Sequence, residues 1–104
     1  METTFSEEVH GMLGNGDVTI IDVRTPEEFA SGHITGALNI DINSPDFEDR
    51  IKKLDPEKQY VVYCQSGGRS GRACSSIREF GFHKTMNLAG GIVSWEREGF
   101  SVEK

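Results

Sequence analysis

The sequence of 104 residues contains only two cysteines, Cys64 and Cys74. Two thiols are too few for a disulfide framework, and their spacing does not fit the paired cysteines of structural zinc sites. We therefore expect no metal and no cofactor. A catalytic thiol becomes the more informative hypothesis for this chain.

Long apolar runs and an excess of basic charge are also missing. No segment approaches the roughly 18 apolar residues that span a bilayer, so we expect no membrane insertion. The formal net charge of −6 argues against a nucleic-acid surface, which needs a basic face. The acidic segment 1–8 lacks the basic start and apolar stretch of an export signal, which predicts a cytoplasmic protein unless such a signal was removed.

What is present is an ordinary globular composition, with 36% hydrophobic and 27% charged residues. No internal repeat or linker divides the chain, so we treat residues 1–104 as one domain. Short segments rich in β-branched and apolar residues predict four strands, at 18–23, 37–40, 60–63 and 85–88. The first strand is apolar on both faces, as expected for a strand that is covered on both sides.

Helical patterns fill the intervals between these strands. The segment Thr25-Pro26-Glu27-Glu28 combines a capping threonine, a proline and a glutamate, which is typical of a helix start. Thr4 or Ser6 is expected to cap a first helix, with an apolar face formed by Phe5, Val9, Met12 and Leu13. Further helices are predicted at 44–54, 70–80 and 92–98. Strands that alternate with helices predict an α/β fold, with a mainly parallel central sheet of four to five strands flanked by helices on both faces.

Cys64 directly follows the third predicted strand, at the edge where parallel sheets bind ligands. The residues Gln65, Ser66, Gly67 and Gly68 come next. The two glycines permit positive φ, so that consecutive N–H groups can form an anion-binding nest, and the following helix adds its positive N-terminal end. Arg69 and Arg72 supply cations at the rim.

These features favour the thiolate form of Cys64. A pKa lowered from ~8.5 to about 6.5 raises the thiolate fraction at pH 7 from roughly 3% to roughly 75%. The intrinsic nucleophilicity falls roughly tenfold over the same two units, so ionisation alone gains only a few-fold in rate. We therefore expect the loop to act mainly by stabilising negative charge above Cys64.

The segment 64–70, Cys-Gln-Ser-Gly-Gly-Arg-Ser, resembles the active-site loop of the rhodanese family, which has six residues from Cys to Arg inclusive. Related dual-specificity phosphatases and arsenate reductases use a loop one residue longer, wide enough for phosphate or arsenate. The resemblance continues upstream and toward the C-terminus, over residues 21–24, 28–29, 32–34, 36–40, 90–95 and 99–100. It implies a rhodanese-like fold.

The resemblance also implies a sulfurtransferase with a two-step reaction. Cys64 attacks the outer sulfur of thiosulfate, a small anionic donor, or of another sulfane donor, and then carries a persulfide. A thiol, cyanide or the cysteine of a partner such as a thioredoxin-like protein accepts that sulfur. Backbone amides of residues 65–69 bind the persulfide, and Arg69 and Arg72 guide the donor.

The remaining polar residues near the loop have simpler interpretations. We expect Asp22, Arg24 and Ser70 to support the loop. Asp22 and Arg24 either brace it or pair with Glu28, rather than touching substrate. Cys74, on the inward face of the helix at 70–80, is interpreted as a packed residue, with a resolving thiol as the alternative.

Two other functions remain open at this point. One is a delivery or partner-binding module that has little activity on small molecules. The other is a phosphatase or arsenate reductase, which the short loop disfavours.

Overall fold

A five-stranded sheet forms the centre of the computed structural model, which describes residues 2–14 and 16–104. The strand order is β1-β5-β4-β2-β3, and every neighbouring pair is parallel. The predicted α/β class is therefore confirmed. The strands are β1 Thr3–Thr4, β2 Val18–Asp22, β3 Leu38–Asn39, β4 Gln59–Tyr63 and β5 Thr85–Leu88.

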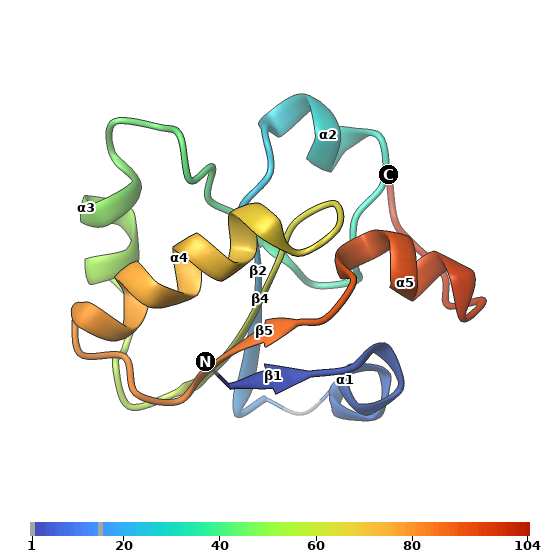
Figure 1. Ribbon diagram of the computed structural model, residues 1–104, viewed down its shortest axis with the longest axis horizontal. Helices are drawn as coiled ribbons and strands as arrows, with labels where there is room; N and C mark the ends of the chain where they lie inside the picture. The colour runs from blue at the N-terminus through green and yellow to red at the C-terminus, as the bar shows by residue number, and fades with distance from the viewer. Residues whose placement is uncertain (1, 15) are drawn as a thin grey trace.

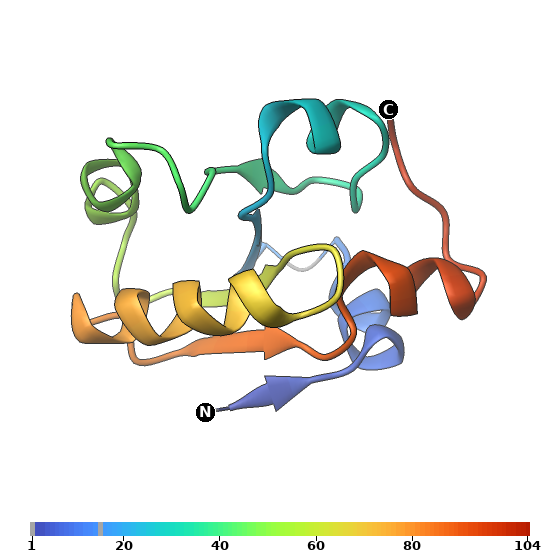
Figure 2. The same ribbon diagram turned by 45° about the horizontal axis from the view of Figure 1, so that its top comes forward.

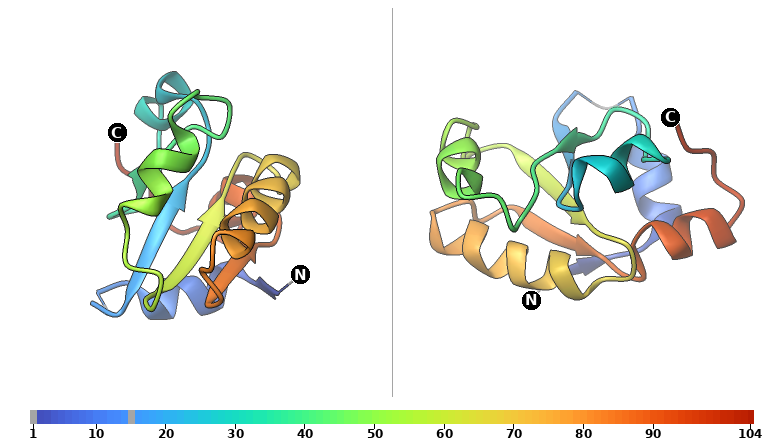
Figure 3. Two further views of the ribbon diagram at one scale, coloured as in Figure 1. Left: turned by 90° about the vertical axis from the view of Figure 1, so that its left-hand side faces the viewer. Right: turned by 90° about the horizontal axis from the view of Figure 1, so that it is seen from above.

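Helices cover both faces of this sheet, as the sequence predicts. Helices α3 and α4 lie on one side of the sheet, and α1 and α5 lie on the other (Figure 1). Helix α2 lies beyond the carboxyl end of β2, as the left-hand view of Figure 3 shows. The helices are α1 Ser6–Met12, α2 Pro26–Ala30, α3 Phe47–Lys52, α4 Gly68–Glu79 and α5 Gly91–Arg97.

Adjacent residues of one strand supply two separate cores, because side chains alternate across a sheet. Ile21 and Val62 pack with α3 and α4, whereas Ile20 and Val61 pack with α1 and α5. Trp95 of α5 is fully buried in the second core. Within the described part of the chain, no helix is long and apolar enough to cross a membrane.

The beginning of the chain differs from the prediction. Residues Thr3 and Thr4 form an edge strand against β5, with Thr4 paired to Leu88, and this strand was not predicted. Helix α1 therefore starts at Ser6 after Phe5, with no side-chain cap, so the predicted caps Thr4 and Ser6 are wrong. Phe5 is 59% exposed rather than part of the apolar face, while Val9 is buried as predicted.

Helix α4 also begins earlier than predicted, at Gly68 instead of Ser70. Gly67 is the residue before the helix and has φ +121°, a value that favours glycine, whereas Gly68 is helical. The turn between β4 and α4 is therefore only four residues long, 64–67. Consequently Arg69 lies in the first turn of the helix.

Candidate active site

The turn after β4 lies beside the start of α5 (Figures 1 and 2). Two N–H groups of the first turn of α5 donate to carbonyls of the turn: Ile92 N to Cys64 O at 3.0 Å and Val93 N to Gln65 O at 3.1 Å. These bonds direct the two carbonyls toward α5. The N–H groups of the following residues are then available on the other side of the turn.

Gly91 makes this close approach possible. A β-carbon at this position would lie 2.6 Å from the carbonyl oxygen of Gln65 and closer still to that of Cys64. Gly91 also has φ +57°, in the left-handed region that favours glycine. Both the space and the backbone conformation therefore require glycine here.

The sulfur of Cys64 accepts a hydrogen bond from the backbone of its own turn, with Gly67 N at 3.1 Å from Sγ. Burial alone would raise the pKa of the Cys64 thiol and is the largest single influence on it. Hydrogen bonds from the Ser70 hydroxyl and from the N–H groups of Ser70, Gly67 and Ser66 outweigh burial, so the pKa is lowered. The donors acting on Cys64 thus come from residues 66, 67 and 70.

Cys64 is only 1% exposed, although the residues that follow it, Gln65 and Ser66, are exposed. The thiol therefore lies directly beneath a solvent-facing turn. This placement keeps the hydrogen bonds to Sγ out of bulk water, and hydrogen bonds are stronger in such a low-dielectric environment than in water.

Ser70 connects the turn to the sheet. Its hydroxyl lies 2.6 Å from Asn87 Oδ1 of β5 and 3.2 Å from the carbonyl oxygen of Gly67, and Ser70 itself is fully buried. A hydroxyl has one proton, so these two oxygens and the Cys64 sulfur compete for it. Asn87 thereby influences the donor that acts on the thiol.

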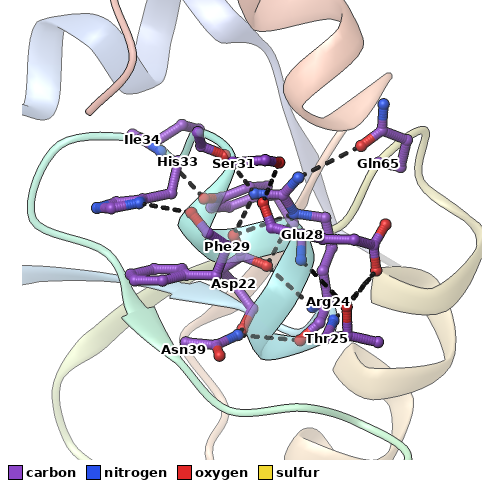
Figure 4. A network of polar contacts seen from close by, with 12 residues as sticks. Asp22, Arg24, Thr25, Glu28, Phe29, Ser31, His33, Ile34, Asn39 and Gln65 are labelled. Carbon is purple, nitrogen blue, oxygen red and sulfur yellow. Dashed lines mark hydrogen bonds and ion pairs between the residues drawn. The ribbon is translucent and has the colours of Figure 1, made fainter. Parts of the chain in front are cut away.

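Asp22 and Arg24 form a buried ion pair under the turn, 2.7 Å apart and 0% and 3% exposed (Figure 4). Arg24 also donates from Nη2 to the carbonyl of Gly32 at 2.7 Å and from Nη1 to Gln65 Oε1 at 3.3 Å. Its charge is thus compensated by Asp22, and its Nη1 donor braces the turn through Gln65. Arg24 therefore pairs with Asp22, and the alternative of a pair with Glu28 is wrong, because Glu28 pairs with Arg69.

Arg69 pairs with Glu28 of α2. Arg69 Nη1 lies 2.7 Å from Glu28 Oε1 and Nη2 lies 2.9 Å from Oε2, a bidentate contact between α4 and α2. The Arg69 guanidinium lowers the pKa of Glu28 to about 2, with the capping contacts from Thr25 adding to the effect against burial. Arg72, one turn further along α4, is exposed.

Cys74 is fully buried among the side chains between the sheet and α4. Burial raises its pKa to about 12, so it is a thiol at neutral pH. Both cysteines are free. Among residues 2–14 and 16–104, no group of three or more His, Cys, Asp or Glu residues is arranged to bind a metal ion.

Comparison with known proteins assigns the family. A model described as the Rhodanese-like domain matches residues 5–98. The chain belongs to the rhodanese family. It is 36% identical over 86 residues to a sulfurtransferase of Allochromatium vinosum, covering 83% of this chain and 78% of the relative. It is 42% identical over 82 residues to the putative sulfurtransferase YtwF of Bacillus subtilis, covering 79% and 77%.

The solved structures agree with this assignment. A rhodanese-related protein from Thermoplasma volcanium superposes with a TM-score of 0.88 at 29% identity, covering 99% of this chain and 98% of the other. This rhodanese is therefore a sulfurtransferase or a sulfur-transfer module. The six residues 64–69 that suggested the family comprise the turn 64–67 and the first two residues of α4.

Sequence reasoning missed three residues that the structure places at this turn. Glu28 was interpreted as a helix cap and a possible partner of Asp22 or Arg24, but not of Arg69. Gly91 was noted only within the family resemblance, and Asn87 only as part of a strand. The sequence carried one signal, the glycine pair at 90–91 that the family resemblance includes. The pairing of Glu28 with Arg69, 41 residues later, has no local signature.

Proposed function

We propose that this rhodanese transfers sulfane sulfur from thiosulfate or a persulfide to a thiol or cyanide acceptor, with Cys64 as the nucleophile. The single observation that carries the proposal is the hydrogen bond from Gly67 N–H to Cys64 Sγ at 3.1 Å. Together with the donors from Ser66 and Ser70, it favours a thiolate at a buried position. A thiol with only a structural role has no need of such donors.

The first half-reaction transfers one sulfur atom. The Cys64 thiolate attacks the outer sulfur of thiosulfate, the S–S bond of the donor breaks, and sulfite leaves with the bonding electron pair. The product is a Cys64 persulfide anion, so atoms and charge balance without an external oxidant. In the second half-reaction, the acceptor thiolate or cyanide attacks the outer sulfur of the persulfide and regenerates the Cys64 thiolate.

The N–H groups that face Cys64 can act in both half-reactions. They stabilise negative charge on the thiolate before sulfur transfer and on the persulfide after it. Neither half-reaction requires a general base, because the attacking group is already ionised. This accounts for a site whose working groups are backbone donors and a serine hydroxyl.

The test is the intact mass of the protein after incubation with thiosulfate. We expect a gain of about 32 Da, one sulfur atom, which cyanide removes. The Cys64→Ser variant should fold and gain no mass, and Cys74→Ala is the matched control that should still gain it. An unmodified wild-type protein, or a Cys64→Ser variant that turns over like the wild type, would refute the assignment.

A delivery module is the second candidate, and the 1% exposure of Cys64 favours it. A partner cysteine presented in an extended segment would reach the thiol after local adjustment of the turn, whereas small molecules would react slowly. Comparing cyanide with a thioredoxin-like protein as acceptors separates the two candidates. Hydrolysis of p-nitrophenyl phosphate that exceeds sulfur transfer would instead support the phosphatase reading.

A further inference from the structure

The ion pair between Glu28 and Arg69 joins two segments that border the Cys64 turn. The carboxylate occupies both terminal nitrogens of the guanidinium, at 2.7 and 2.9 Å. These nitrogens form the planar fork that binds oxyanions such as carboxylates in a bidentate manner. An anionic donor that used this fork would have to displace Glu28.

Glu28 is also held from its other side. Its Oε1 accepts hydrogen bonds from Thr25 N at 3.1 Å and Thr25 Oγ1 at 3.2 Å, which complete the capping box of α2 (Figure 4). Rotating the carboxylate away from Arg69 would break these bonds as well. The negative charge of Glu28 is therefore a permanent part of the site.

The other two arginines considered from the sequence, Arg24 and Arg72, differ in whether a carboxylate pairs with them. Arg24 is compensated by buried Asp22 at 2.7 Å. No carboxylate lies within ion-pair distance of Arg72 in the part of the chain that the structure describes. Arg24 and Arg69 are thus each neutralised by a carboxylate, whereas Arg72 is exposed.

We propose that Glu28 determines donor specificity, by cancelling the charge of Arg69 and so disfavouring dianionic thiosulfate relative to persulfide donors that carry at most one negative charge. This inference rests on the proposed sulfur transfer. With a persulfide RSSH, the Cys64 thiolate attacks the outer sulfur, the donor S–S bond breaks, and RS⁻ leaves with the electron pair. The electrostatic penalty scales with donor charge, so it is largest for thiosulfate.

The test compares kcat/KM of two donors, thiosulfate and 2-hydroxyethyl persulfide, in the wild type and in Glu28→Gln. In a double-displacement reaction, kcat/KM for the donor reports the first half-reaction alone. Removing one negative charge near the site should raise the value for thiosulfate about tenfold and that for the persulfide about threefold or less. Added salt should reduce the difference between the two gains.

Glu27→Gln is the matched control. It removes the same charge from the same helical turn, but Glu27 is exposed and makes no ion pair with Arg69. We expect less than about a twofold change with either donor, because solvent screens an exposed charge.

The double variant Glu28→Gln/Arg69→Gln keeps the proposal testable if Glu28→Gln does not fold. Because the pair is replaced by two neutral residues, the ratio of kcat/KM for thiosulfate to kcat/KM for the persulfide should stay within about twofold of the wild type. A lower ratio in the double variant would show that Arg69 acts as a free cation in the wild type and would overturn the inference. So would Glu28→Gln leaving the ratio unchanged while Cys64 still takes up sulfur. If Cys64 takes up sulfur from neither donor in the wild type, the proposed function itself fails.

Discussion

Gly91, the first residue of α5, lies so close to Cys64 that the next residue, Ile92, donates a 3.0 Å hydrogen bond to the Cys64 carbonyl. The two residues belong to different elements, β4 with its turn and α5. The conformation of the turn, and with it the direction of its N–H groups, therefore depends on the position of α5.

We expect Gly91→Ala to reduce sulfur loading of Cys64 at least tenfold and to lower the free energy of unfolding by about 2 kcal/mol or more. The added methyl group would collide with the carbonyls of Cys64 and Gln65 and displace the turn. The loading rate by mass spectrometry and a chemical denaturation curve measure the two effects.

The control variant Gly14→Ala separates the two effects expected of Gly91→Ala, the collision of the added methyl group and the strain of a positive φ. Gly14 has φ +86°, also in the left-handed region, but a β-carbon there would have no atom within 4 Å. It should lose about 1 kcal/mol of stability and keep full sulfur loading. Equal loss of loading in both variants would contradict the role assigned to the contact between Gly91 and the turn.

The pH dependence of Cys64 alkylation should report the donors around its sulfur. A lowered pKa means that the thiolate is present, and the alkylation rate is near its plateau, at a lower pH than for an ordinary cysteine. In Ser70→Ala the hydroxyl donor is lost, so we expect the midpoint of the rate profile to move upward by about one pH unit. A small uncharged alkylating reagent such as iodoacetamide suits the buried thiol.

Ser75→Ala is the control for this measurement. Ser75 lies on the same helix, is exposed, and donates only to the Gly71 carbonyl within α4. Its profile should coincide with that of the wild type. A Ser70→Ala profile that also coincides with the wild type would mean that the Ser70 hydroxyl donates to Asn87 Oδ1 or the Gly67 carbonyl and not to the Cys64 sulfur.

The buried pair of Asp22 and Arg24 should matter for stability much more than the exposed pairs. Asp22→Asn leaves the Arg24 charge buried without a counterion, so we expect a loss of about 3–5 kcal/mol in the free energy of unfolding. Glu48→Gln removes the exposed Glu48–Lys52 pair and should cost less than about 0.5 kcal/mol. Urea denaturation measures both, and similar losses in the two variants would contradict the structural role of Arg24.

Local patterns in the sequence were sufficient for much of this protein. The capping box of Thr25 and Glu28 was predicted and is present, because it depends on four consecutive residues. The alternation of strands with helices predicted the parallel sheet and its covering on both faces. The residues at 64–70 indicated the family because motif and spacing are carried by one continuous segment.

Other features could only be decided by the tertiary structure. The strand at Thr3–Thr4 exists because β5 offers it an edge, which two threonines do not reveal by themselves. The pairs Glu28–Arg69 and Ser70–Asn87 join residues from different elements. Such contacts arise because parallel strands bring the turns that follow them to one edge of the sheet, where packing of distant segments sets which side chains meet. The amino-acid sequence thus determined the family and the fold, while the charge and the hydrogen bonds around Cys64 were decided by how the elements pack together.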